Sequence, residues 1–278
     1  MPIDQQLLDT LEENAVAVIG APYDENSTYM RGSAGAPPKI REALSCGSAN
    51  LCSEDVLDLG KEALFCDLGD MEFAPGKAPL EEIETAVGQV LDKKARVLLL
   101  GGDHAVTPAA VRAYHRQYGQ INILHFDAHP DLYEEFEGNR NSHACPFARI
   151  MEEKLAKRLV QVGIRTVNPH QKDQAERFGV EVVHMKAWQT GMVFHFDGPL
   201  YISFDMDALD PAYAPGVSHH EPGGLSTRDV LSALQTLEAP IIGADIVEFN
   251  PLRDASGMTA MVAAKLLKEL AAKMLNYT

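Results

Sequence analysis

Residues 121–131 have the sequence INILHFDAHPD, in which an apolar run leads directly into a polar cluster. Asp127, His129 and Asp131 follow the run at intervals of two residues. Alternate residues of a strand face the same side of a sheet, so this spacing brings the three polar groups together. Burying two carboxylates and an imidazole costs free energy unless another group pairs with them. The stretch therefore predicts a buried strand whose end presents polar side chains to a common partner.

An apolar run followed by a helical pattern recurs along the chain. Strands are expected at residues 15–20, 96–102, 121–127, 159–164, 200–205 and 241–250, and weaker ones at 63–69 and 180–184. Strands that alternate with helices and are apolar throughout form parallel sheets that are covered on both faces. We therefore expect one α/β domain over residues 1–278, with a mainly parallel sheet of about eight strands.

Three helices are marked most clearly, and they are expected at residues 107–118, 227–238 and 257–275. Thr107 is expected to cap the first of them, because a threonine directly before a proline is typical of a helix start. Ser226 and Asp229 have the spacing of a capping box for the second. The third has apolar residues at helical intervals and lysines on its polar side.

The composition limits the classes of function. Of the 278 residues, 46% are hydrophobic and 23% are charged, which is typical of a soluble globular protein. The formal net charge is -16. This charge argues against nucleic acid and anionic membranes as partners, and it suits a cationic substrate. Solubility alone would also explain it.

The N-terminal segment and the cysteines provide evidence about the cellular compartment of the protein. MPIDQQLLDTLEEN is acidic and has no apolar run, so it resembles neither a signal peptide nor a transit peptide. No segment approaches the ~20 consecutive apolar residues that span a membrane. The four cysteines form no CxxC pair, although Cys46 and Cys52 are close enough in sequence to pair. These features predict a reduced compartment, and we expect a cytoplasmic location.

Four polar clusters each follow an expected strand. They are GGDH at 101–104, DAHPD at 127–131, DMDALD at 205–210 and VEFN at 247–250. In open parallel sheets the carboxyl ends of the strands lie at one edge, and ligands bind there. We therefore expect the four clusters to meet at one place.

The residue types in these clusters are typical metal ligands. The candidates are His104, Asp127, His129, Asp131, Asp205 and Asp207. Four carboxylates packed together repel one another, and two divalent cations would balance their charge. A carboxylate-rich set with a few imidazoles suits Mn²⁺ better than zinc. Each motif also has a simpler explanation, namely a helix start at His104, a capped turn at DAHPD, and a turn or single-metal site at DMD.

GGDH, DAHPD and SFDMDALDP together resemble the three metal motifs of the ureohydrolases, the family that includes arginases and agmatinases. The similarity runs from about Val16 to the C-terminus and is strongest over residues 125–152, 203–226 and 243–266. It is greatest toward plant-type arginases. The resemblance implies a three-layer α/β/α sandwich, two Mn²⁺ per subunit, and assembly as a homotrimer or homohexamer.

The resemblance also implies a role for each candidate residue. One ion would be held by His104, Asp127, Asp131 and Asp205. The other would be held by Asp127, His129, Asp205 and Asp207, with Asp127 and Asp205 bridging the two. His143, in SHACPF, matches the family's proton-handling histidine. Glu248, in VEFNP, matches the carboxylate that binds the guanidinium group of the substrate.

A mechanism follows from this set of groups. A hydroxide that bridges the two ions would attack the guanidinium carbon of a small cationic guanidino substrate. Asp131 would relay the hydroxide proton to the leaving amine, and His143 would supply or shuttle a proton. The products would be urea and an amine, and the favoured reaction converts L-arginine to L-ornithine.

The choice of substrate depends on donors at the mouth of the site. In EGNRNSH (137–143), Asn139 and Ser142 are the candidate contacts for the α-carboxylate of arginine, with Arg140 as a third. Asn168 stands where animal-type arginases have an aspartate. Typical agmatinases have a loop ending in DHGT where this chain has SHAC. The plant-type resemblance favours arginase, with agmatinase or another guanidino-acid hydrolase as alternatives, and each of these polar residues is equally compatible with an ordinary loop.

Two other classes remain open. A zinc deacetylase of related fold usually lacks the histidine of GGDH and has a His-His pair in its catalytic loop, whereas His219–His220 lies in another segment, PGVSHHEPGG. A non-enzymatic metal-binding protein should have lost a ligand or His143. This chain retains all of them.

Overall fold

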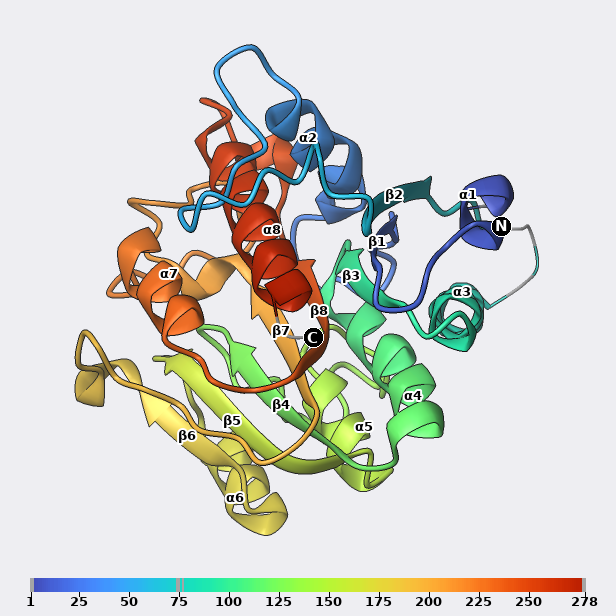
Figure 1. The fold of residues 1–278 in the computed structure, drawn as a ribbon. Helices are drawn as coiled ribbons and strands as arrows, with labels where there is room; N and C mark the ends of the chain where they lie inside the picture. Colours follow the sequence, from blue (N-terminus) through green and yellow to red (C-terminus); the bar gives the residue numbers. More distant parts are fainter. Residues whose placement is uncertain (1–2, 74–75, 77, 277–278) are drawn as a thin grey trace.

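The computed structural model describes residues 3–73, 76 and 78–276, and its centre is one sheet (Figure 1). The strands are β1 (Val16–Gly20), β2 (Phe65–Asp70), β3 (Arg96–Leu100), β4 (Ile121–Phe126), β5 (Ala156–Ile164), β6 (Glu181–His184), β7 (Leu200–Asp205) and β8 (Ile241–Val247). Their order is β2-β1-β3-β8-β7-β4-β5-β6, and every neighbouring pair is parallel. The expected eight-stranded parallel sheet is confirmed.

Helices cover both faces of this sheet. They are α1 (Gln5–Asp9), α2 (Ala36–Leu44), α3 (Pro79–Asp92), α4 (Thr107–Tyr118), α5 (Pro146–Glu152), α6 (Pro169–Phe178), α7 (Thr227–Gln235) and α8 (Met258–Asn276). Val16 and Val18 of β1 pack in the core that contains α2, α7 and α8. Ala17 and Ile19 pack in the core that contains α1, α3 and α4. Alternate residues thus serve opposite layers, which is the three-layer arrangement that we expected.

The observed strand ends differ from the expected ones where the backbone leaves the sheet. The strand expected at 241–250 ends at Val247, because Glu248 has a φ of 62°. That left-handed conformation cannot continue a strand. The strand expected at 96–102 ends at Leu100, where Gly101 and Gly102 follow. A Cβ atom on Gly102 would lie 1.8 Å from the Tyr23 carbonyl oxygen, so this crossing of the two segments requires glycine.

The expected helix starts were partly right. Ser226 and Asp229 form the capping box at the start of α7. Thr107 is not the cap of α4, because a 3₁₀ turn, η2 (His104–Val106), precedes it, and Asp103 caps that turn. The Thr107 hydroxyl instead donates to Asp245 at 2.9 Å. A buried carboxylate on the neighbouring strand therefore engages this hydroxyl, so it is not available to cap the helix.

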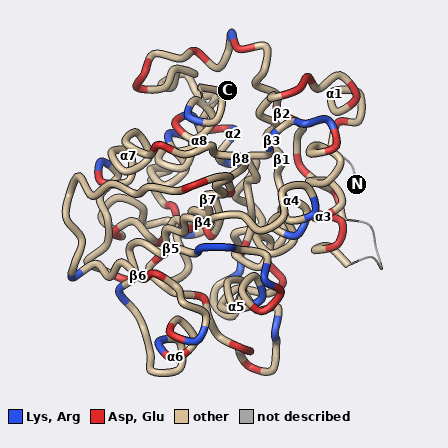
Figure 2. Tube along the Cα trace, turned by 60° about the horizontal axis from the view of Figure 1, so that its bottom comes forward, with Lys and Arg blue, Asp and Glu red and all other residues tan. Residues whose placement is uncertain are grey.

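The surface is consistent with the strongly acidic composition. Figure 2 shows Asp and Glu distributed over many elements, with Lys and Arg interspersed. All four cysteines are free thiols, so Cys46 and Cys52 do not form the disulfide that their spacing allowed. In the described ranges, no helix has both the length and the apolar character required to cross a bilayer.

Candidate metal centre and substrate pocket

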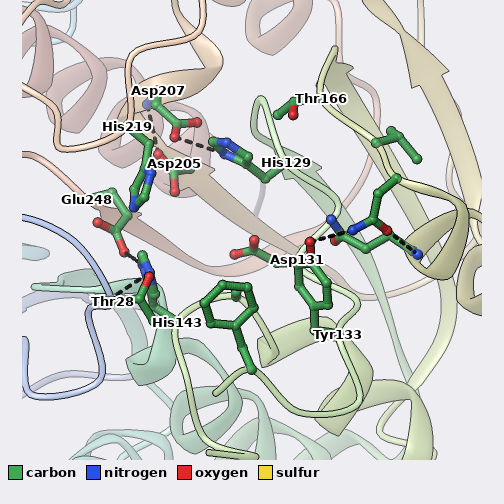
Figure 3. A pocket seen from close by; sticks show the side chains of 15 residues that line it. Thr28, His129, Asp131, Tyr133, His143, Thr166, Asp205, Asp207, His219 and Glu248 are labelled. Atoms are coloured by element: carbon green, nitrogen blue, oxygen red, sulfur yellow. Dashed lines mark hydrogen bonds and ion pairs between the residues drawn. The ribbon is translucent and has the colours of Figure 1, made fainter.

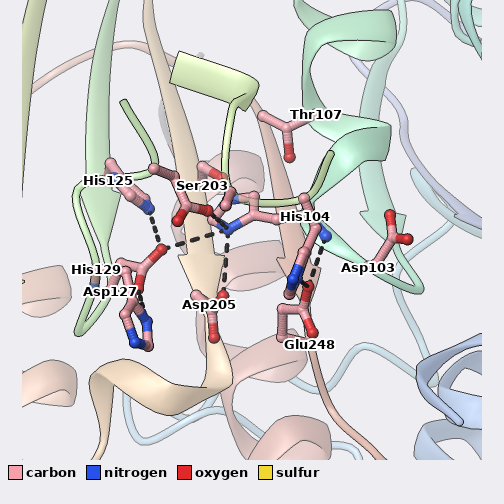
Figure 4. Close-up of polar contacts among 12 residues, drawn as sticks. Asp103, His104, Thr107, His125, Asp127, His129, Ser203, Asp205 and Glu248 are labelled. Atoms are coloured by element: carbon pink, nitrogen blue, oxygen red, sulfur yellow. Dashed lines mark hydrogen bonds and ion pairs between the residues drawn. The ribbon is translucent and has the colours of Figure 1, made fainter. Parts of the chain in front are cut away.

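The polar clusters meet at the carboxyl edge of the sheet, as expected (Figure 4). His104 Nδ1 lies 3.3 Å from Asp127 Oδ2, 3.3 Å from Asp131 Oδ2 and 3.1 Å from Asp205 Oδ2. His129 Nδ1 lies 3.3 Å from Asp127 Oδ1 and 3.1 Å from Asp207 Oδ2. All six predicted ligand side chains therefore converge, and Asp127 contacts both histidines through different oxygens. Their assignment as ligands stays a prediction.

Backbone groups fix the carboxylates in place. Asp127 Oδ1 accepts from the His129 amide at 2.6 Å. Asp205 Oδ1 accepts from the Asp207 amide at 2.8 Å, and Asp207 Oδ1 accepts from the Ala128 amide at 3.1 Å. In each of these carboxylates, one oxygen thus accepts a hydrogen bond from a backbone amide. The Oδ2 atoms of both Asp205 and Asp207 face a histidine. The D-x-H and D-x-D spacings make the bonds from His129 to Asp127 and from Asp207 to Asp205 available, whereas Ala128 reaches Asp207 from a different segment.

A row of polar side chains crosses the sheet beneath the cluster. Gln161, His125, Ser203 and Asp245 are in register on the adjacent strands β5, β4, β7 and β8. His125 Nε2 lies 2.8 Å from Asp127 Oδ2. Ser203 Oγ lies 3.0 Å from His104 Nε2 and donates to Asp245 Oδ1 at 2.7 Å. This row therefore orients two of the candidate ligands from below.

The electrostatics of the cluster show carboxylates in excess of nearby cations. Burial, together with Asp207 and Asp127, raises the pKa of Asp205 well above its usual range. Burial and Asp127 raise the pKa of Asp131 to about 6. Burial opposes ionisation of Asp127 too, but His125 and His104 hold its pKa well below normal. Such a set of donors fits divalent cations, which would relieve the repulsion.

Two residues of the site have an unusual backbone. Asp131 has a φ of 50° and Glu248 a φ of 62°. Non-glycine residues rarely adopt this region, and it costs of order 1–3 kcal/mol when the surroundings impose it. Both residues are among the four carboxylates that border the cavity, and backbone strain of this kind is common at functional sites.

Glu248 and His143 form a buried pair beside the cluster. His143 Nδ1 lies 2.8 Å from Glu248 Oε1, and His143 Nε2 lies 2.8 Å from the Thr28 hydroxyl. Glu248 Oε1 also accepts from the His104 amide at 2.9 Å. Although burial opposes its charged form, the pKa of His143 is raised to about 9 by Glu248. His143 is therefore placed to carry a proton at neutral pH.

A cavity of about 260 Å³ opens onto this cluster (Figure 3). Its inner end is formed by Asp205, Asp207, Glu248 and His143. Its other side, which we call the mouth, is lined by the partly exposed Tyr133, Phe136, Thr166 and Asn168 and by the buried Gln171. Figure 3 places Tyr133 across the cavity from Glu248, and Asp131 between them. The cavity therefore joins a carboxylate-rich end to an aromatic and amide-lined end.

The expected contacts at the mouth are only partly in position. Asn168 lines the cavity, but it caps α6 through Oδ1 and donates from Nδ2 to the Tyr133 hydroxyl at 2.6 Å. Asn139 is exposed and bonds to Asn26 at 2.8 Å. Ser142 is 1% exposed and borders a separate small cavity beside α4 and α5. The structure does not bring Asn139 or Ser142 to the cavity. Arg140 instead pairs with Glu152 at 2.7 Å.

Several residues at the site were missed by sequence reasoning. Tyr133, Gln171, Thr28 and His219 line the cavity but belong to loops or helix starts without a motif of their own. His219 lies close to His143 and His129, and burial together with His143 lowers its pKa below the usual value. The sequence carried a signal for the polar row, because each of its members has an apolar residue on either side within its strand.

Comparison with known proteins identifies the family. The Arginase family model matches residues 14–272. The chain is 46% identical to "Arginase 1, mitochondrial" of Arabidopsis thaliana, over 94% of this chain and 81% of that protein. It is 44% identical to "Arginase 2, chloroplastic/mitochondrial" of the same plant, over 93% and 80%. The solved arginase from Medicago truncatula has a TM-score of 0.89 at 43% identity, covering 97% of this chain and 91% of that one.

These relatives contradict one expectation and confirm another. The cytoplasmic location expected from the sequence is contradicted, because the matching plant arginases are named as mitochondrial or chloroplastic proteins. The plant-type resemblance and the fold are confirmed by the family model, the relatives and the solved structure. The chain therefore belongs to the arginase family of ureohydrolases.

Proposed function

We propose that this protein hydrolyses L-arginine to L-ornithine and urea. The observation that carries the proposal is the meeting of four buried aspartates and two histidines with Glu248 at the inner end of one cavity. The similarity to plant proteins named as arginases supports the choice of arginine. Family membership also favours a ureohydrolase over the related zinc deacetylases.

We further propose two Mn²⁺ ions as the metals of this metal-dependent family site. His104, Asp131 and Asp205 would hold one with Asp127, and His129 and Asp207 would hold the other with Asp127 and Asp205. The oxygen-rich donor set suits Mn²⁺. When bound, the two ions supply a nucleophile at neutral pH by lowering the pKa of a water molecule.

Side chains of the protein itself would orient the substrate and transfer protons in the remaining steps of the reaction. Glu248 attracts and orients the guanidinium cation, because its carboxylate is buried and faces the cavity. Asp131 borders the cavity between the cluster and the mouth, so its carboxylate is placed to accept a proton and pass it on. His143, with a pKa of about 9, can donate a proton to the leaving amine.

Recognition of the α-carboxylate would fall to the mouth of the cavity. The Tyr133 hydroxyl accepts from Asn168, so its own proton is free to donate. Gln171 accepts from the Leu132 amide through Oε1 at 3.2 Å, so its NH₂ group is the end that remains for the substrate. Tyr133 and Gln171 thus replace Asn139 and Ser142 as the proposed carboxylate contacts.

Agmatine is the alternative substrate, and one observation favours it. Both ends of the Asn168 amide are already bonded within the protein. Only one N–H of Asn168 remains, and its direction is fixed by these two bonds, so Asn168 offers at most one donor to the α-carboxylate of arginine, the group that agmatine lacks. The contacts that would discriminate arginine from agmatine are then those of Tyr133 and Gln171.

The test is urea release by Mn²⁺-loaded protein, with arginine, agmatine, guanidinobutyrate and guanidine compared side by side. We expect kcat/KM to be highest for arginine. A higher value for agmatine would replace the proposed substrate, and no urea from any of the four would overturn the proposed function.

Two further expectations rest on the family resemblance. We propose that residues 1–278 form one domain and that the subunits assemble as a homotrimer or homohexamer. Light scattering of the purified protein would give the subunit number directly. A monomer would contradict the assembly.

A further inference from the structure

His219 is a cavity-lining histidine for which neither the metal cluster nor the proton-handling pair accounts. It lies in the loop between η4 (Met206–Ala208) and α7, and its side chain borders the cavity. Among the described residues, its Nε2 atom is buried and has no hydrogen-bond partner. A buried polar atom without a partner is rare and costs free energy. Its position therefore calls for a partner that the chain itself does not provide.

The loop holds His219 in a defined place. The Ser218 hydroxyl donates to the Met30 carbonyl at 2.8 Å and accepts from Asn250 Nδ2 at 2.9 Å. Asn250 lies two residues after Glu248, and Val217 pairs with Phe249. The segment before His219 is thus bonded to the segment that carries Glu248. The two side chains are positioned by the same set of contacts.

The neighbours of the ring place it at the inner end of the cavity. Its centroid lies 5.3 Å from that of His143 and 5.8 Å from that of His129. Figure 3 shows His219 between Asp207 and Glu248, on the side opposite to Tyr133. The ring is therefore near the end where the guanidinium group would lie, and away from the mouth that would bind the carboxylate.

The chemistry of a guanidinium matches what His219 offers. A guanidinium is planar and carries N–H donors in several directions, so one carboxylate cannot satisfy all of them. A neutral imidazole presents one nitrogen lone pair as an acceptor. Rotation about χ2, which is a soft torsion for an imidazole, would turn the enclosed Nε2 toward the cavity. Glu248 and His219 would then accept from different N–H groups of the same cation.

We propose that His219 is a substrate-contacting residue whose imidazole accepts an N–H of the guanidinium at the inner end of the cavity. This rests on the proposed function as a guanidino hydrolase and adds a second acceptor beside Glu248. Because the contact is to the group shared by all guanidino substrates, His219 raises affinity for each of them equally. It does not discriminate arginine from agmatine.

The test compares His219→Ala and His219→Gln with the neighbouring His220→Ala. Glutamine can place a polar atom near the position of Nε2, whereas alanine cannot. His220 is exposed, and its Nε2 bonds to the Pro215 carbonyl at 2.8 Å, so its variant controls for a general loosening of the loop. The readouts are KM for arginine and agmatine, metal content, and the Kd of guanidinium chloride measured by calorimetry on the metal-loaded protein.

We expect His219→Ala to raise both KM values by the same factor, about 10-fold to 100-fold, as for a hydrogen bond to a charged group. The Kd of guanidinium should rise in parallel, and the metal content should stay unchanged. His219→Gln should restore most of the affinity that His219→Ala loses. His220→Ala should change the KM values and the guanidinium Kd by no more than about 2-fold.

Three results would overturn the proposal, in addition to unequal effects on the two substrates. They are an unchanged guanidinium Kd in His219→Ala, an equal loss in His220→Ala, and loss of metal from the His219 variants. If the unaltered protein released no urea, the proposed function would fail, but the guanidinium Kd would still decide whether His219 binds this cation. A much larger effect on arginine than on agmatine would place the contact at the mouth instead.

Discussion

The inner end of the cavity and its mouth differ in how their side chains are held. At the inner end, Asp127, Asp205 and His104 follow strands and are bonded by backbone amides and by the polar row beneath them. At the mouth, Tyr133 and Gln171 come from separate segments and meet through a few bonds. From this comparison we infer that the end with more internal bonds carries the chemistry and that the end with fewer bonds selects the substrate. Four variants test it.

The largest effect is expected from Asp127→Ala. Asp127 contacts both His104 and His129, so its loss should empty both metal positions and lower kcat/KM by at least about 10³-fold. Metal content per subunit and urea release measure this, and circular dichroism checks the fold. Asp173→Ala, on the exposed side of α6, is the matched control. Two full metal equivalents in the Asp127 variant would contradict its bridging role.

A smaller effect is expected from Ser203→Ala, which removes the group that contacts His104 Nε2 from the strand below. Support of this kind typically changes metal affinity by about 10-fold to 100-fold. We expect metal affinity to fall by this factor at one of the two metal positions, as measured by competition with a chelator. Thr107→Val is the control, because Thr107 also bonds Asp245 but does not contact His104. Equal losses in both variants would assign the effect to Asp245 instead.

At the mouth, Tyr133→Phe should separate the two candidate substrates. Loss of one hydrogen bond to a carboxylate should raise KM for arginine by about 10-fold and leave KM for agmatine within about 2-fold. Steady-state assays of urea release with both substrates measure this. Tyr213→Phe, at an exposed site, provides the control. Equal changes for the two substrates would remove Tyr133 as a carboxylate contact.

The smallest effect is expected from Asn139→Ala. The sequence suggested that Asn139 binds the carboxylate, but the structure places it outside the cavity with its amide bonded to Asn26. KM for arginine should therefore stay within about 2-fold, as for most exposed substitutions. A rise in KM for arginine alone would restore Asn139 to the mouth and would require the 137–143 loop to move on binding.

The sequence alone determined the sheet, its layers and the candidate metal ligands. Hydrophobic periodicity and capping depend on residues a few positions apart, so all eight strands and the capping box at Ser226 were predictable. The ligand motifs were predictable for the same reason. Each follows its strand directly, and parallel strands end at one edge.

Only the tertiary structure decided the partners of these groups and the lining of the cavity. The row of Gln161, His125, Ser203 and Asp245 exists because of strand register, which pairs residues that are far apart in sequence, such as His125 and Ser203. Asn139 and Ser142 lie in a loop whose path no periodicity describes, and His219 reaches the cavity because Ser218 is bonded to Met30 and Asn250. Local sequence fixes which side chains a strand presents, but contacts between distant segments fix what those side chains meet.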